Sequence, residues 1–226
     1  MIAQKYLTPE KARQIINILR DKLQDELPGV DAHLRLAPAL RRKDLSAGSL
    51  PSDALNSAVL IILYPLKKRL HTVVILRNEY DGAHSGQISF PGGKAEKCDS
   101  TFLDTALREA QEEIGINPAD MEIIGPLSTF YVSPSNFVIY PFLAYSAKHP
   151  VFQPDPMEVQ KIVEIDIFQR LRFEKIIQKE LTFKNGFQIT VPGFSLGSEF
   201  MWGATAMIIS ELITLLEKVE VEIENP

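Results

Sequence analysis

The sequence has a single cysteine, Cys98, and no apolar run as long as a membrane span. One cysteine excludes an intramolecular disulfide and gives no sign of an oxidising compartment. A membrane-spanning helix needs about 20 consecutive apolar residues, and residues 1–5 lack the pattern of a signal peptide. These absences predict a cytoplasmic protein that has no membrane partner.

An excess of positive charge is also missing. The chain carries 24 Lys and Arg against 29 Asp and Glu, a formal net charge of −5. A protein that binds a nucleic-acid backbone usually has a basic face, so we expect no nucleic-acid partner. A small phosphorylated ligand stays open, because bound metal ions can supply the positive charge.

The residues that are present suit one large domain, or one domain with extensions. Of the 226 residues, 45% are hydrophobic, which is enough for an ordinary core without disulfides or structural metal. No internal repeat and no low-complexity segment is visible. A polar segment at residues 28–56 contains Arg41-Arg42-Lys43, which we interpret as a solvated patch, with contact to a ligand phosphate as the alternative.

Hydrophobic patterns predict helices at both ends of the chain and strands between them. Thr8 and Pro9 are typical of a helix start, and the first helix is expected over residues 8–27. A helix over residues 201–219 is expected to bury Trp202 in the core. The runs at 57–64 and 71–76 predict an antiparallel pair of strands. They are so apolar that both faces are expected to be covered, which favours a sheet between helices. Further strands are expected at 121–132, 136–145, 159–165 and 187–191.

A short helix that ends at Gly115 carries an unusual group of acids. Glu109, Glu112 and Glu113 fall within one arc of this helix, because residues three and four apart are neighbours. Carboxylates are disfavoured in the last turn of a helix, where the dipole is negative. Arg108 can offset Glu112 but not all three acids. A divalent cation would offset them, since Mg²⁺ and Mn²⁺ bind carboxylate oxygens; a solvated acidic face is the alternative.

The loop before this helix, residues 77–93, is rich in glycine, hydroxyl and amide groups. Such a loop offers many backbone N–H groups, and concave arrangements of these groups suit phosphate oxygens. A generic turn is the alternative. The pair Gly92-Gly93 directly before an acidic helix favours the phosphate interpretation.

These two segments together resemble the Nudix hydrolase family. The family motif has Gly, five residues, Glu, seven residues, and then Arg-Glu-aliphatic-any-Glu-Glu-any-Gly-aliphatic. Gly93 is followed after five residues by Asp99, and residues 108–116 match the second half. The chain departs from the motif in three ways: Asp99 replaces the first Glu, eight residues separate it from Arg108, and Ala110 stands where a larger aliphatic residue is usual. The motif therefore leaves the role of Asp99 unassigned.

The segment 84–93, with Arg77 before it, resembles the coenzyme A pyrophosphatase branch of this family, as do residues 202–206. The resemblance implies an α/β fold: a Nudix-type α/β/α sandwich with a mixed sheet and a catalytic loop-helix-loop. It implies one domain over residues 1–226, with a helical extension at about 1–56 and the core at about 57–220.

The resemblance also implies the site residues. Mg²⁺ or Mn²⁺ is expected on the Gly93 carbonyl and on Glu109, Glu112 and Glu113. Glu112 is the first choice to accept the water proton, and Glu109 is a further catalytic candidate. Glu158, in its proline-flanked loop, is a candidate for an additional acid near the site, and an ordinary loop acid is the alternative. Arg108 is expected to anchor the glutamates. The expected substrate-binding residues lie in the upstream loop: Arg77, Ser85, Gly86, Gln87 and Gly92.

Three residues near the motif receive other expectations. Arg77 either contacts substrate phosphate or braces the loop. His84 is expected to brace the loop through a hydrogen bond, and Cys98 is expected to have no role.

The resemblance implies hydrolysis of the diphosphate linkage of coenzyme A or acyl-coenzyme A. The products are 4′-phosphopantetheine or its acyl form and adenosine 3′,5′-bisphosphate. One alternative is another nucleoside diphosphate derivative, such as ADP-ribose or a dinucleotide. A different alternative is a non-catalytic nucleotide-binding regulatory module. A homodimer is compatible with the resemblance, because dimers are common among relatives.

Overall fold

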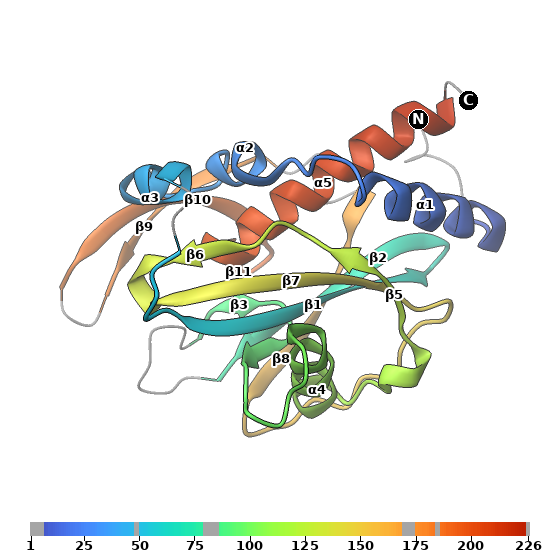
Figure 1. Ribbon diagram of the computed structural model, residues 1–226, viewed down its shortest axis with the longest axis horizontal. Coiled ribbons are helices and arrows are strands. Elements are labelled where there is room, and N and C mark those ends of the chain that lie inside the picture. Colours follow the sequence, from blue (N-terminus) through green and yellow to red (C-terminus); the bar gives the residue numbers. More distant parts are fainter. Residues whose placement is uncertain (1–6, 48–49, 79–85, 169–174, 184–185, 225–226) are drawn as a thin grey trace.

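The computed structural model in Figure 1 describes residues 7–47, 50–78, 86–168, 175–183 and 186–224. A large mixed sheet lies between two helical layers. One layer contains the acidic helix α4 (Phe102–Ile114), and the other contains α1 (Pro9–Lys22), α2 (Gly29–Leu34) and α5 (Gly203–Glu224). This is the α/β sandwich that the sequence predicts.

The central strand of the large sheet is β1 (Leu55–Leu66). It runs parallel to β7 (Phe137–Tyr145) on one side. On its other side it pairs antiparallel with β4 (Gly92–Lys94) near its start and with β2 (Arg69–Arg77) near its end. The strand β2 also pairs with β3 (Ile88–Ser89) and β8 (Val159–Asp166). The strands β5 (Glu122–Pro126) and β6 (Phe130–Val132) pair with β7.

Successive residues of β1 point to opposite faces of the sheet, and both faces are covered. Leu60 and Ile62 pack with Ala106 and Ala110 of α4. Their neighbours in β1 belong instead to the larger core beneath α1 and α5. This explains the nearly continuous apolar run, because neither face of β1 meets water.

The first helix is shorter than predicted. Thr8 caps α1, accepting a hydrogen bond from the Lys11 backbone N–H at 3.3 Å, but the helix ends at Lys22 rather than near residue 27. The polar segment that follows contains unpredicted short helices: α2, η2 (Ala39–Arg41) and α3 (Arg42–Ala47). The solvated-patch interpretation is wrong for Arg41, which is buried and donates to the Tyr131 carbonyl at 2.7 Å.

Two further 3₁₀ turns, η3 (Pro118–Asp120) and η4 (Ser133–Ser135), flank β5 and β6. A single strand was expected over residues 121–132, but β5 and β6 are separate.

A second sheet of three strands contains β9 (Ile177–Thr182), β10 (Gln188–Leu196) and β11 (Glu199–Trp202). The helix expected to start at residue 201 begins instead at Gly203, because residues 199–202 form β11. Trp202 is therefore not a core residue of α5. Among the described residues, no helix is both long and apolar enough to cross a membrane.

Candidate active site

Helix α4 begins and ends where local chemistry dictates. Thr101 accepts a hydrogen bond from the Asp104 backbone N–H, and the Asp104 carboxylate accepts one from the Thr101 N–H in return. This capping box satisfies donors that the first turn leaves without partners. Gly115 ends the helix in the left-handed conformation, with φ of 69°. The three glutamates therefore lie in its last two turns, as predicted.

Glu113 is the most deeply buried of the three acids, and its side chain is 0% exposed. One oxygen accepts a hydrogen bond from the Gly92 backbone N–H at 2.8 Å. The other accepts one from Arg77 Nη1 at 2.6 Å. Burial raises the pKa of Glu113 to about 7, although Arg77 and the Gly92 N–H oppose the shift. This carboxylate thus ties the helix to both the Gly-Gly turn and β2.

Glu109 lies against the backbone of the same turn. A Cβ atom at Gly93 would overlap the Glu109 carboxylate, and one at Gly92 would overlap the Ala58 carbonyl of β1. Only glycine fits at position 92, where the overlap is with backbone; at position 93 the Glu109 carboxylate would have to move. Burial raises the pKa of Glu109, and the ion pair with Arg108 opposes this shift. Close contact between a carboxylate and a bare backbone is the reason for the Gly-Gly sequence here.

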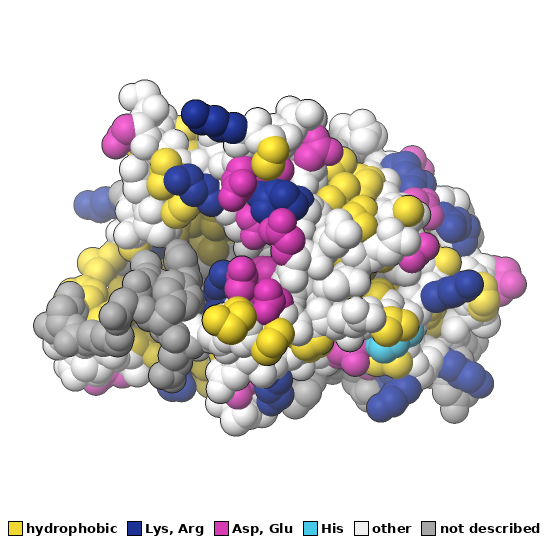
Figure 2. All heavy atoms as spheres, turned by 90° about the horizontal axis from the view of Figure 1, so that it is seen from below, with side chains coloured by type: hydrophobic (Ala, Val, Ile, Leu, Met, Phe, Trp, Pro, Cys, Tyr) yellow, Lys and Arg dark blue, Asp and Glu magenta, His cyan; other side chains and the backbone are white. Residues whose placement is uncertain are grey.

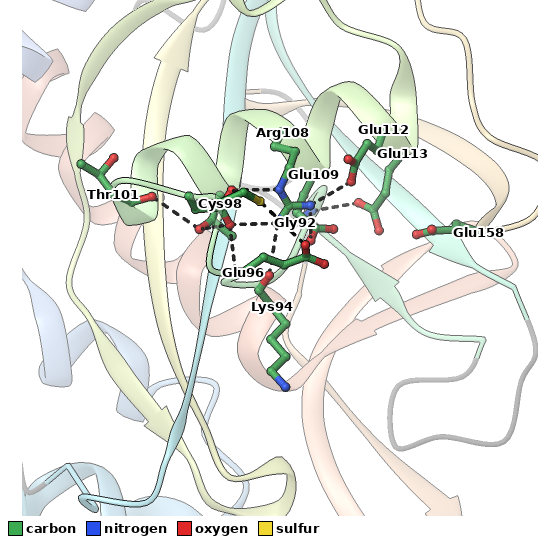
Figure 3. Close-up of polar contacts among 12 residues, drawn as sticks. Gly92, Lys94, Glu96, Cys98, Thr101, Arg108, Glu109, Glu112, Glu113 and Glu158 are labelled. Carbon is green, nitrogen blue, oxygen red and sulfur yellow. Dashed lines mark hydrogen bonds and ion pairs between the residues drawn. The ribbon is translucent and has the colours of Figure 1, made fainter.

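Arg108 holds the remaining acids in place. Its Nη1 lies 2.9 Å from both Glu109 Oε1 and Glu112 Oε2, and its Nη2 donates to the Lys94 carbonyl at 3.2 Å. Figure 3 shows this guanidinium at the centre of the polar contacts. The predicted anchoring role of Arg108 agrees with these contacts.

Asp99 is the second partner of Arg108. Its two oxygens accept from Arg108 Nε at 2.9 Å and Nη2 at 3.0 Å, and it also accepts from Thr105 Oγ1 and the Glu96 N–H. The Arg108 guanidinium, together with these two donors, holds the pKa of Asp99 well below its usual range. The residue that the motif leaves unassigned is thus a structural partner of Arg108.

Arg77 is the last residue of β2, and Glu158 lies just before β8, the strand that pairs with β2. Glu158 directly precedes β8, is 49% exposed, and lies 4.0 Å from Arg77 Nη2. Figure 3 shows Glu158 extending towards Glu113 from the far side of the site. The structure therefore brings together Arg77, Glu158 and the three helix glutamates. Figure 2 shows the face on the α4 side of the molecule, where acidic side chains gather around basic ones.

The upstream loop is described only in part. Ser85 and His84 lie outside the described residues. The Gly86 N–H donates to the Asn78 carbonyl at 3.3 Å, and the Gln87 carbonyl accepts from the Arg77 N–H at 3.1 Å. These contacts extend the loop along the end of β2.

Ser89 was missed at the level of sequence. It pairs with Ile75 of β2, which lies on the α4 face of the sheet, so Ser89 faces the same side as the glutamates. Its Oγ is buried and has no hydrogen-bond partner in the part of the chain that the structure describes. Its place in the hydroxyl-rich segment 84–93 was a signal that could have marked it.

The donors fit a hard divalent cation in kind, since carboxylate and carbonyl oxygens are the ligands that Mg²⁺ and Mn²⁺ prefer. Within the described ranges, however, no three acidic, imidazole or thiol groups are close enough to hold an ion directly. The acids are turned instead towards Arg108 and Arg77. Glu112 is 56% exposed and has room to rotate. The four-residue metal set therefore stays a prediction.

Comparison with protein families matches residues 54–182 to the NUDIX domain, which is more than half of the chain. The chain belongs to the Nudix hydrolase family. It is therefore an enzyme that acts on pyrophosphate bonds, and Nudix hydrolases generally use divalent metal ions.

Curated relatives agree with this assignment. The chain is 32% identical to the "Uncharacterized Nudix hydrolase NudL" of Yersinia enterocolitica over 73% of this chain and 83% of that protein. It is 31% identical to the protein of the same name from Klebsiella pneumoniae over 80% of this chain and 95% of that protein. Neither name specifies a substrate.

Among solved structures, a MutT/nudix family protein from Enterococcus faecalis has a TM-score of 0.51 and 18% identity. The match covers 84% of this chain and 73% of that one. At this identity the likeness supports the Nudix fold alone.

Proposed function

We propose that this Nudix hydrolase cleaves the diphosphate linkage of coenzyme A or acyl-coenzyme A in the presence of Mg²⁺ or Mn²⁺. The products would be 4′-phosphopantetheine, or its acyl form, and adenosine 3′,5′-bisphosphate. The observation that carries the proposal is the contact between the acidic helix and the loop that resembles the coenzyme A branch. Glu113 bonds both Gly92 and Arg77 of that loop segment.

The proposed ligands of the ion are the Gly93 carbonyl, Glu109, Glu112 and Glu113. When bound, the ion supplies positive charge to the phosphate oxygens and lowers the pKa of a bound water. Arg108 holds the carboxylates of Glu109 and Glu112 in position through its ion pairs. Asp99 in turn keeps Arg108 in place.

Glu112 is proposed to accept the proton of the attacking water. The water oxygen forms a bond to phosphorus, the bond from phosphorus to the bridging oxygen breaks, and the second phosphate leaves as an anion. Glu112 suits this role because it is 56% exposed and can reach a water molecule. Glu158, on the opposite side of the site, is proposed as an additional acid near the diphosphate.

Arg77, Gly86, Gln87 and Gly92 are proposed to bind substrate, together with Ser85. The buried Ser89 hydroxyl faces the same side of the sheet and offers one further donor. The Arg77 guanidinium and the Ser89 hydroxyl are donors that suit phosphate oxygens. The N–H groups of Gly86 and Gly92 already donate to Asn78 and Glu113, so these glycines would contribute close approach of the backbone.

We further propose one domain over the whole chain, placed in the cytoplasm and able to form a homodimer. Support for one domain comes from packing, because residues of α1 and α5 belong to the same core as the sheet.

A substrate panel tests the proposed function. Purified protein with Mg²⁺ or Mn²⁺ is offered coenzyme A, ADP-ribose and NADH, and the products are identified. We expect cleavage of coenzyme A to the two named products. Survival of coenzyme A with cleavage of ADP-ribose would reassign the substrate, and no cleavage with either metal would favour a nucleotide-binding module.

A further inference from the structure

The second sheet has one face that is turned away from the core. Phe194 and Met201 pair with each other and are both buried in the core. Adjacent residues of a strand point to opposite faces, so Trp202 and its partner Gly193 lie on the other face. We call this the outer face, and define it by its eight apolar side chains: Ile177, Leu181, Phe183, Phe187, Ile189, Val191, Phe200 and Trp202.

The aromatic rings of the outer face contact one another. The Phe183 ring centroid lies 6.1 Å from that of Phe187 and 6.4 Å from that of Trp202. Phe200 covers Gly193, where an added Cβ would lie 2.6 Å from the Phe200 ring. These residues therefore form one aromatic surface rather than scattered apolar positions.

Part of this surface is exposed, although Val191 at its centre is 0% exposed. Ile177 is 40% exposed, Phe183 is 37% exposed and Phe187 is 50% exposed. Contiguous exposed apolar residues mark binding surfaces more often than isolated ones do. Its described charged neighbour is Lys179, whose Nζ lies 5.2 Å from the centre of the Phe200 ring. The surface thus suits an extended apolar group.

A chain of contacts connects the outer face to the Gly92-Gly93 turn, which we call the catalytic turn. Thr205, three residues after Trp202, donates to the Ile88 carbonyl of β3 at 3.0 Å. The strands β11 and β3 are in contact, and Ile88 precedes Gly92 by four residues.

We propose that the outer face binds the acyl chain of an acyl-coenzyme A while its diphosphate lies at the glutamates. This inference rests on the proposed function and adds the part of the substrate that determines preference. In such a substrate an apolar chain is tethered to the diphosphate, which matches an aromatic surface linked to the catalytic turn.

A second copy of the chain is the competing occupant, and β9 opposes one route to it. Two β9 strands paired antiparallel about a two-fold axis near their middle would place Lys179 opposite Lys179, or Glu180 opposite Glu180. Like charges directly opposite one another are destabilising, and charges on an edge strand disfavour such pairing.

The chain contains a single tryptophan, Trp202, so its fluorescence reports occupation of the outer face directly. Wild-type protein in EDTA, which prevents metal-dependent turnover, is titrated with coenzyme A and with octanoyl-coenzyme A. We expect octanoyl-coenzyme A to shift the Trp202 emission to the blue and to bind saturably. Its Kd should be at least tenfold lower than that of coenzyme A. An identical response to the two compounds would overturn the proposal.

Steady-state kinetics provide a second test of the proposal. We expect Phe187→Ser to lower the ratio of kcat/KM for octanoyl-coenzyme A over coenzyme A by about tenfold, because the chain loses an apolar contact. The matched control is Val221→Ser on α5, which removes another exposed apolar side chain (62% exposed) and should leave this ratio unchanged.

The outcomes separate the two proposals. If neither coenzyme A compound is hydrolysed while ADP-ribose is, the proposed function fails. If both are hydrolysed, but Trp202 fluorescence and the kcat/KM ratio ignore the acyl chain, only the acyl-chain proposal fails. If Phe187→Ser converts a dimer to a monomer and leaves chain preference unchanged, the outer face is a self-association surface and the acyl-chain proposal is wrong.

Discussion

Arg108 is the residue on which the geometry of the acidic helix depends. One guanidinium bonds Asp99 through two nitrogens and also reaches Glu109 and Glu112. An arginine fork suits this task, because its planar donors match a carboxylate with two parallel hydrogen bonds. Without Asp99, Arg108 would be free to swing towards solvent and would no longer hold the two glutamates in place.

Replacing Asp99→Asn tests this role. We expect a loss of about 1.5–3 kcal/mol in the free energy of unfolding at pH 7, typical of a hydrogen bond to a charged group. Because the pKa of Asp99 is lowered in the folded protein, its contribution is present above its unfolded pKa and is lost as pH falls through its folded pKa. Urea unfolding at several pH values measures this. The difference between wild type and Asp99→Asn should shrink as the solution becomes acidic, and a constant difference would contradict the assignment.

Replacing Glu112→Gln tests the proposed proton acceptor. Glutamine has the same shape, but its amide is not basic enough to accept the water proton. We therefore expect kcat to fall about 10²- to 10⁴-fold. Thermal unfolding should be close to that of wild type, since Glu112 is largely exposed. The control is Glu217→Gln, a partly exposed acid on α5. Near-wild-type turnover would remove Glu112 from the mechanism.

At the scale of elements, α4 was predictable because its signals are local. Thr101 and Asp104 form the start, Gly115 forms the stop, and Ala106 and Ala110 set the buried stripe. Each of these contacts lies within one or two turns, so the sequence is sufficient to place the three glutamates. The contact between Glu109 and Gly93 could not be predicted from the sequence, because it depends on how the sheet positions β4 beneath the helix.

The substitution Gly93→Ala tests that contact between elements. The new methyl group would overlap the Glu109 carboxylate and displace it from the proposed ion site. We expect at least tenfold weaker Mn²⁺ binding by calorimetry, and a smaller rise in Tm when Mg²⁺ is added. Gly197→Ala is the control: no atom lies within 4 Å of the added Cβ, but the φ of 74° strains an alanine there, so this variant should lower Tm without changing Mn²⁺ affinity. Equal Mn²⁺ affinity in Gly93→Ala and wild type would exclude Glu109 or Gly93 as a ligand.

At the scale of the whole molecule, α5 joins the N-terminal helices to the sheet through a buried polar group. Glu211 is 0% exposed, lies 3.0 Å from His33 Nε2 of α2, and accepts from Ser128 Oγ at 2.5 Å. Burial alone would raise the pKa of Glu211, but the hydrogen bonds from His33 and Ser128 outweigh it and hold that pKa below its ordinary value. These contacts fix α2 and the segment after β5 on one helix.

We therefore expect Glu211→Ala to lower the free energy of unfolding by about 3 kcal/mol, because removing one partner leaves buried polar groups unsatisfied. For a chain of this size that corresponds to a fall in Tm of roughly 6–12 °C. Calorimetry of Glu211→Ala beside Glu217→Ala makes the comparison. Equal melting temperatures would show that the buried group contributes little.

The N-terminal segment and the second sheet were harder to predict for a shared reason. The short helices α2 and α3 have six residues each, and isolated helices of that length are not stable in water. They depend on packing against distant parts of the chain. In the same way, residues 199–202 form a strand because β10 lies beside them, and the tryptophan that a helical pattern assigned to the core lies on the opposite face.

The pairing of β4 with the central strand has a consequence for motion. Gly92, Gly93 and Lys94 pair with Val59, Ala58 and Ser57 of β1, and β1 is enclosed on both faces. Segments of this kind exchange their amide hydrogens only when much of the protein opens. Although glycine pairs often serve as hinges, this pair is held by β1, and Gly92 is buried. The Gly92-Gly93 turn is therefore rigid, and any change of shape for different substrates would occur in the segments around it.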